Sequence, residues 1–201
     1  EALAAEVGSN GGMYFVPAFS GLFAPRWRSD ARGTMVGMTA FNTKGHLCRA
    51  ALEAAAFQAR EVIEAMGKDL GGDGTFNAEL QVDGGMTMNS ICMQVSGVRY
   101  LMDLLFFTFL SLYINDLLLF FQFQSDILGC PVRRPTIPET TALGAAYSAG
   151  LATGVWSSVE ELKKMWGEDR RWEPNMGEEE KSKLWSEWHK AVEKSLGWVK
   201  E

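Results

Sequence analysis

The stretch that decides the fold is Leu80-Gln81-Val82-Asp83-Gly84-Gly85-Met86-Thr87-Met88-Asn89. Leu80 and Val82 alternate with polar neighbours, which is the periodicity of a strand. The glycine pair that follows predicts a tight turn where a ligand can approach the main chain closely. Thr87 or Asn89 can cap a helix whose free N–H groups face that turn, an arrangement that suits a phosphate or nucleotide. The local pattern by itself favours an ordinary strand-to-helix turn.

The bulk composition indicates a soluble globular domain. The chain has 201 residues, of which 47% are apolar and 22% charged, enough for one domain with a sizeable core. The net charge is −6 and the isoelectric point about 5.1. This balance argues against a surface for nucleic acid or anionic membranes, because such surfaces are usually basic.

Cysteine usage and the first residues bear on location. The three cysteines are odd in number and widely spaced, without metal or redox spacing, so we expect reduced thiols in the cytoplasm. No basic region followed by an apolar run opens the chain, so no signal peptide is predicted. The chain begins without Met, in what reads as the end of a helix at 1–7. We therefore expect a fragment of a longer protein.

The clearest helix is predicted at residues 44–66. Its apolar stripe is formed by Leu47, Ala51, Ala55, Phe57, Val62, Ile63, Ala65 and Met66. Glu53, Glu61 and the neighbouring charges are predicted to face mostly outward. His46, at the start of this helix, is interpreted as a capping or surface residue rather than a ligand or base.

The rest of the chain alternates short strands and helices. Strands are predicted at 13–19, 34–39 and 130–134. Two helices are predicted to start near 139 and 157, and a third, final helix is predicted at 178–198. Residues 170–174 are predicted to form an extended connection. Thr140 or Thr141 is expected to cap the helix near 139, whose many small residues favour tight packing on a sheet. Ser157 or Ser158 is expected to cap the next helix. The tryptophans of the last helix, Trp185, Trp188 and Trp198, are predicted to anchor it to the domain.

Residues 100–123 form an unusually apolar block. Its length would allow a membrane-spanning helix, which needs roughly 20 apolar residues. Asp103 and Asp116 lie inside it, however, and each acid would cost about 2.5–3.5 kcal/mol at a helix centre. A truncated, non-catalytic, membrane-associated product therefore remains only an alternative interpretation.

Removing residues 95–122 restores a regular amphipathic helix. Gln94 then joins Phe123, Ile91 and Ile127 fall on one face with Phe123, and Gly129 ends the helix. Val95-Ser96 can be encoded as a splice-donor sequence, and 120–122 as a pyrimidine tract and acceptor. We predict that 95–122 is a non-native insertion, either a retained intron or an error in the gene model. Abundant mature transcripts that carry the segment would contradict this.

Several stretches in one order resemble the C-terminal domain of glycerol kinases, within the FGGY family of carbohydrate kinases. The matching motifs are Val16-Pro17-Ala18-Phe19-Ser20-Gly21-Leu22-Phe23-Ala24-Pro25-Arg26-Trp27, Ala31-Arg32-Gly33, Gly37-Met38-Thr39, His46 with Arg49-Ala50-Ala51-Leu52-Glu53, Val82-Asp83-Gly84-Gly85-Met86 with Asn89, Phe123-Gln124-Ser125-Asp126-Ile127-Leu128-Gly129 and Pro138-Glu139-Thr140-Thr141-Ala142-Leu143-Gly144-Ala145-Ala146-Tyr147. The resemblance covers nearly all of 8–200 except 95–122. Many relatives have Tyr where Arg26 stands, so the tip of that loop is expected to differ.

The resemblance implies an α/β fold, a partial actin-like, ribonuclease-H-like ATPase domain with a C-terminal helical tail. The domain is expected at 1–154, interrupted by 95–122, and its helical extension at 155–201. It also implies ATP-dependent phosphorylation of glycerol to sn-glycerol 3-phosphate with Mg²⁺. The nucleotide-binding residues carried over by motif are Gly84, Gly85 and Asn89.

The catalytic base and the glycerol-holding residues of the family lie upstream of this chain's motifs. No catalytic residue and no metal ligand are therefore assigned here, and Asp83 is interpreted as a support for the glycine turn. The expected partners are ATP, glycerol, a missing N-terminal domain and, at full length, further copies of the protein, without nucleic acid. The fragment alone is expected to be inactive. A kinase for another polyol or sugar of the family is the alternative.

Overall fold

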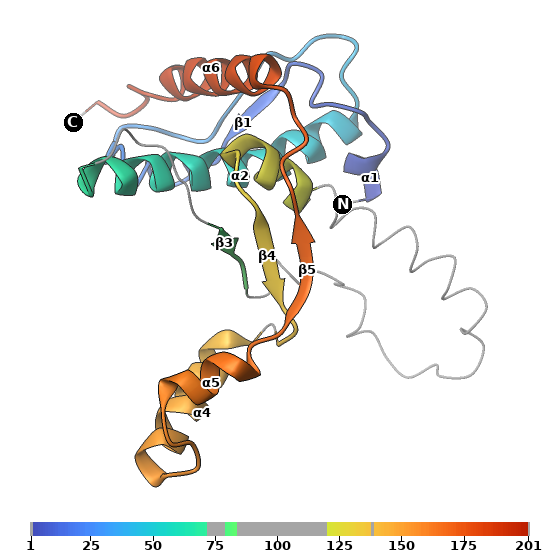
Figure 1. The fold of residues 1–201 in the computed structure, drawn as a ribbon. Coiled ribbons are helices and arrows are strands. Elements are labelled where there is room, and N and C mark those ends of the chain that lie inside the picture. The colour runs from blue at the N-terminus through green and yellow to red at the C-terminus, as the bar shows by residue number, and fades with distance from the viewer. Residues whose placement is uncertain (1, 72–78, 84–119, 138, 201) are drawn as a thin grey trace, which may run out of the picture.

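The computed structural model describes residues 2–71, 79–83, 120–137 and 139–200. An upper layer contains helix α1 (Ala2–Ala5), strands β1 (Tyr14–Val16) and β2 (Thr34–Val36), helix α2 (Lys44–Asp69) and helix α6 (Glu178–Lys194) (Figure 1). A three-stranded sheet descends from it, made of β3 (Leu80–Gln81), β4 (Val132–Pro135) and β5 (Glu168–Trp172). Helices α4 (Thr140–Thr153) and α5 (Val159–Met165) lie at the far end of the sheet.

The main core lies between the β1–β2 hairpin, α2, the helical segment 120–128 and α6. Phe57 of α2 is at its centre. The Phe57 ring stacks on Trp188 of α6 with centroids 5.0 Å apart and meets Phe123 edge-on at 5.4 Å. The prediction that Phe123 and Ile127 share a buried face is confirmed, since both belong to this core. The positions that were expected beside them before residue 95 lie outside the described residues.

Helix α2 confirms the predicted helix and extends it to Asp69. The prediction for His46 is also confirmed, because His46 Nδ1 accepts a hydrogen bond from the Thr43 backbone N–H at 3.0 Å in a capping box. The outward placement of Glu53 and Glu61 is wrong: they are only 4% and 8% exposed. Each carboxylate is paired with arginine, Glu53 with Arg49 at 2.7 Å and Glu61 with Arg26 at 2.7 Å, and pairing makes burial of a charge tolerable.

Three further expectations are corrected. The residues expected to connect as an extended segment form β5, which pairs antiparallel with β4, so the C-terminal tail supplies a strand as well as helices. Helix α4 has Glu139 at its N-cap without a side-chain capping bond, instead of Thr140 or Thr141. Trp198 is 64% exposed and anchors nothing by burial, whereas Trp188 is buried as expected.

Helix α4 does not show the tight packing on a sheet that its small residues led us to expect. Most of its surface is exposed, and Gly150 is its buried residue. A Cβ atom at Gly150 would lie 2.1 Å from Trp156 Cζ3, so a side chain has no room there. The small residue is needed because Trp156 folds back against the helix. For α5 the predicted cap is confirmed, since Ser158 accepts from the Glu161 N–H.

Tyr14 supplies a test of the upper core. Burial raises the pKa of its phenol to about 12, against a hydrogen bond with Asn10 that lowers it. Because this pKa exceeds the unfolded value of about 10, retention of the phenol proton in the folded state contributes to stability, and the contribution is fully present below pH 10. That contribution, at most about 2–3 kcal/mol, should be lost as pH rises towards 12. We expect a late tyrosinate absorbance phase that Tyr14→Phe removes; an unchanged titration in this variant would refute the assignment.

Candidate functional site

The carboxyl ends of β3 and β4 meet at one edge of the sheet. These strands are parallel, with Leu80 opposite Val132 and Gln81 opposite Arg133. The Val82 N–H extends the pairing by donating to the Arg133 carbonyl at 3.0 Å. Because β4 leads into α4 (Figure 1), the start of that helix lies at the same edge. In open α/β sheets this is the edge at which ligands bind.

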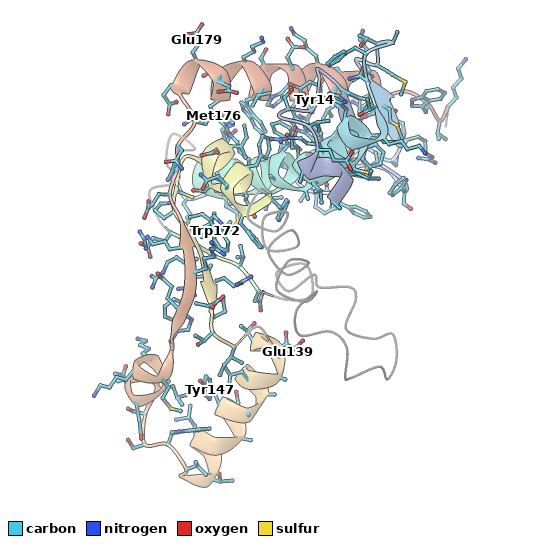
Figure 2. All side chains as sticks on the ribbon, turned by 90° about the vertical axis from the view of Figure 1, so that its right-hand side faces the viewer. Tyr14, Glu139, Tyr147, Trp172, Met176 and Glu179 are labelled. Atoms are coloured by element: carbon cyan, nitrogen blue, oxygen red, sulfur yellow. The ribbon has the colours of Figure 1, made fainter. Side chains whose placement is uncertain are left out.

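A cavity of about 470 Å³ lies at this edge, between the strand ends and helices α4 and α5. Its lining includes Gln81, Thr136, Thr140, Leu143, Tyr147 and Trp166. Thr140, Leu143 and Tyr147 are spaced three and four residues apart, which places them on one face of α4. Figure 2 shows Glu139 and Tyr147 on this helix, at the opposite end of the molecule from Tyr14. Mostly apolar walls with a few hydroxyl and amide groups suit a heterocyclic ligand of nucleoside size.

The predicted nucleotide residues stand next to this edge in the sequence. Asp83 is exposed two residues after the end of β3, and the chain then continues into Gly84 and Gly85. Gly84, Gly85 and Asn89 lie outside the described residues, so their role stays a prediction. The supporting role suggested for Asp83 is likewise not tested.

The cavity lining residues on α4 and after β4 were not singled out from the sequence. The one available signal was the run of small residues in α4, which we interpreted as packing on a sheet. Tyr147 on α4 and Trp166 after α5 line the same cavity, and β5, which follows Trp166, pairs antiparallel with β4. That pairing spans more than thirty positions in the chain, as the partnership of Arg133 with Arg171 shows, and no local pattern reveals it.

Arginines beside the cavity are neutralised by acids. Arg133 donates to Glu79 at 2.5 Å and to Glu168, and its guanidinium lies 4.5 Å from the centre of the Trp166 ring. Arg171 also pairs with Glu79 at 2.5 Å. Hydrogen bonds from Arg171 and Arg133 lower the pKa of Glu79, so this carboxylate stays charged at neutral pH. Arg133 and Arg171 are therefore paired with acids and do not offer a free cationic surface beside the cavity.

A second cavity of about 410 Å³ lies between loop 17–26 and α2. At its base, Glu61 Oε1 accepts from Arg26 Nη2 at 2.7 Å and from Trp188 Nε1 at 2.8 Å. One buried carboxylate thus ties the loop, α2 and α6 together. The sequence left the role of this loop open. In the structure Arg26, which stands where many relatives have Tyr, attaches the loop to Glu61 of α2.

The described residues contain neither a candidate metal site nor a candidate membrane-spanning helix. Among residues 2–71, 79–83, 120–137 and 139–200, no group of three or more His, Cys, Asp or Glu side chains is placed to hold a metal ion. Within the same ranges, no helix is both long and apolar enough to cross a membrane. Most of the apolar block 100–123 lies outside them.

Comparison with known proteins agrees with the fold. The model of the FGGY family of carbohydrate kinases, C-terminal domain, matches residues 1–153. The chain is 51% identical over 199 residues to the glycerol kinase of Clavibacter michiganensis, which covers 99% of this chain and 33% of that protein. It is 51% identical over 201 residues to the glycerol kinase of Renibacterium salmoninarum, covering 34% of it. The chain thus spans about a third of the length of these relatives.

Solved structures give the same result. The crystal structure of Plasmodium falciparum glycerol kinase with ADP superposes with a TM-score of 0.73 at 33% identity, over 99% of this chain and 33% of that one. A ligand-bound xylulose kinase from Lactobacillus acidophilus superposes with a TM-score of 0.61 at 18% identity, over 96% of this chain and 32% of that one, which shows the fold alone. The predicted sugar-kinase fold is confirmed. The chain belongs to the FGGY family of carbohydrate kinases and corresponds to the C-terminal domain of that family.

Proposed function

We propose that this chain is the C-terminal part of a glycerol kinase that transfers a phosphoryl group from ATP to glycerol, giving sn-glycerol 3-phosphate. In this proposal the chain supplies part of the nucleotide site, and an N-terminal domain supplies the catalytic base and the glycerol contacts. The supporting observation is the meeting of two parallel strand ends, the start of α4 and a cavity of about 470 Å³ at one edge. The identity of about half to glycerol kinases favours glycerol over another polyol.

The nucleotide would lie with its base in this cavity and its phosphates at the Gly84-Gly85 turn. Glycines there would let the phosphates approach the main chain, and the Asn89 amide could bind a polar edge of the ligand. Thr136, Thr140 and Gln81 would offer hydroxyl and amide groups around the base. Mg²⁺ is proposed only as the ion that accompanies the phosphates of ATP. Phosphoryl transfer depends mostly on positioning and charge neutralisation, and this edge would contribute positioning.

The binding half of the proposal is tested by titrating the chain with ADP in a calorimeter. We expect Gly85→Val to lower the affinity at least about tenfold, or about 1.4 kcal/mol, because the side chain would fill the space of the approaching phosphate. Gly144→Ala is the matched control, since a Cβ at Gly144 meets no atom within 4 Å. Equal losses in both variants, or a loss in neither, would contradict the assignment of the turn.

The chain alone is expected to form no glycerol 3-phosphate from ATP and glycerol, because the base and the acceptor contacts are assigned to the missing domain. Detectable product from residues 1–201 would overturn that division of labour. A homo-oligomeric state at full length and a cytoplasmic location remain predictions. The free thiols of Cys48 and Cys130 support the second of these.

A further inference from the structure

The loop between β1 and β2 exposes three large aromatic side chains. Phe19, Phe23 and Trp27 are 73%, 69% and 73% exposed. Phe19 and Phe23 also line the cavity of about 410 Å³ beside α2, and the Trp27 N–H donates to the Phe23 carbonyl at 3.0 Å. Single exposed apolar residues are ordinary on a protein surface, but several on one loop mark an interaction surface. We call these three side chains the aromatic surface.

The loop that carries the aromatic surface is held in place by contacts within the chain. Arg26 Nη2 lies 2.7 Å from Glu61 Oε1 on α2, and Arg28 Nη2 lies 2.6 Å from Asp30 Oδ2. Leu22 and Arg28 exchange two backbone hydrogen bonds of 2.8 Å. The three rings are therefore presented in a fixed arrangement, which reduces the ordering cost of association.

Trp27 has a backbone conformation that the stability of the loop alone does not explain. Its φ is 50°, in the left-handed region, where a bulky residue is an outlier. A strained residue persists only where its surroundings hold it, and such residues gather at functional sites. Tryptophan is also one of the side chains that contribute most to protein–protein interfaces. We therefore expect Trp27 to lie within the contact.

The charges around the aromatic surface favour a second copy of this chain as its occupant. The whole chain carries a net charge of −6, so two copies repel each other in general. The loop 17–28 differs, since its charged residues, Arg26 and Arg28, are neutralised by Glu61 and Asp30. Two such surfaces can meet without placing unpaired like charges against each other.

The area of the aromatic surface is close to what a specific dimer requires. A buried aromatic side chain covers about 150–250 Å², and about 70% of each of the three side chains is exposed. Two copies would together remove roughly 600–1,100 Å² of this surface from water. The exposed Ser20, Ala24 and Pro25 add to it, so the contact reaches the roughly 1,000 Å² expected of a specific interface.

We propose that the chain forms a two-fold dimer in which the aromatic surface of one copy packs against that of the other, beside the cavity that Phe19 and Phe23 line. A two-fold axis buries the same loop on both copies and therefore closes the assembly at the dimer. The contact uses none of the residues assigned to the nucleotide, so it is independent of the proposed function.

The test is sedimentation of the full chain, residues 1–201, over about 1–100 µM, where an interface of this size should give a dissociation constant on the order of 10 µM. Trp27→Asn and Phe23→Ala should each raise that constant at least about tenfold. Asparagine tolerates the left-handed region, so Trp27→Asn should leave the urea midpoint of the dilute chain unchanged. This second measurement separates loss of the contact from loss of the fold.

Phe41→Ala is the matched control and should leave the dissociation constant unchanged. Phe41 is 74% exposed, and its ring lies 5.4 Å from that of His46. His46 and Glu61 are fifteen positions apart on α2, which corresponds to about 22 Å along the helix. The control therefore removes an equally exposed ring at a distance from the loop.

Weaker association in both loop variants, with an unchanged Phe41→Ala variant, supports the proposal. A chain that stays monomeric at about 100 µM overturns it and leaves the aromatic surface to another occupant, such as the N-terminal domain. Association that is indifferent to Trp27 and Phe23 also overturns it. Growth beyond the dimer contradicts the two-fold arrangement, because a head-to-tail contact would continue into longer assemblies.

Discussion

Replacing Phe57 with alanine is expected to lower the free energy of unfolding by about 3–5 kcal/mol, the usual range for deleting a buried aromatic ring. Phe57 contacts four aromatic side chains from three segments of the main core: Tyr14 on β1, Phe123 in segment 120–128, and Trp185 and Trp188 on α6. The surrounding rings are large and cannot all move inward, so a cavity should remain. Urea unfolding of the chain measures the loss.

Phe41→Ala is the matched control for this prediction. Phe41 is 74% exposed, and its substitution should change the unfolding free energy by less than about 0.5 kcal/mol. Similar effects at both positions would mean that Phe57 does not occupy the centre of the core.

Replacing Arg26 with methionine is expected to cost about 3–5 kcal/mol, because it leaves the Glu61 carboxylate buried without its charged partner. The Trp188 indole N–H would then be the remaining donor to the Glu61 carboxylate among the contacts described above. Removing both charges in Arg26→Met with Glu61→Leu should recover a large part of the loss, since a buried ion pair contributes little compared with apolar residues of similar size. The comparison of these variants in urea measures the coupling directly.

The control for the Arg26–Glu61 pair is the exposed ion pair on α6 between Lys190 Nζ and Glu187 Oε1, which lie 2.6 Å apart. Lys190→Met should cost less than about 1 kcal/mol. If the double variant at Arg26 and Glu61 is no more stable than Arg26→Met alone, the Glu61 carboxylate is not left buried and unpaired when Arg26 is lost.

The parts of this fold that sequence predicts are those whose signal is local. The helical state of residues 44–66, the Ser158 cap of α5 and the helical face of Phe123 and Ile127 each depend on residues within a few positions of one another. Each of these predictions is confirmed by the structure.

The errors arise where a distant partner decides the outcome. Glu61 reads as a surface residue of α2 because its partners, Arg26 and Trp188, come from a loop and from the last helix. Tyr147 is a cavity residue because Gln81 and Trp166, both distant from it in the sequence, line the same space. Gly84, Gly85 and Asn89 stay predictions because they lie outside the described residues.

Strand β5 has a consequence for how the protein behaves in concentrated solution. It forms one edge of the described sheet, and its exposed residues carry mixed charges: Glu168, Asp169, Arg170 and Arg171. Charged edge strands resist pairing with strands of other molecules, which is a common start of aggregation. β5 covers β4, which would otherwise be exposed to pairing with a strand of another molecule. Because β5 itself is charged, we expect it to reduce aggregation of the domain.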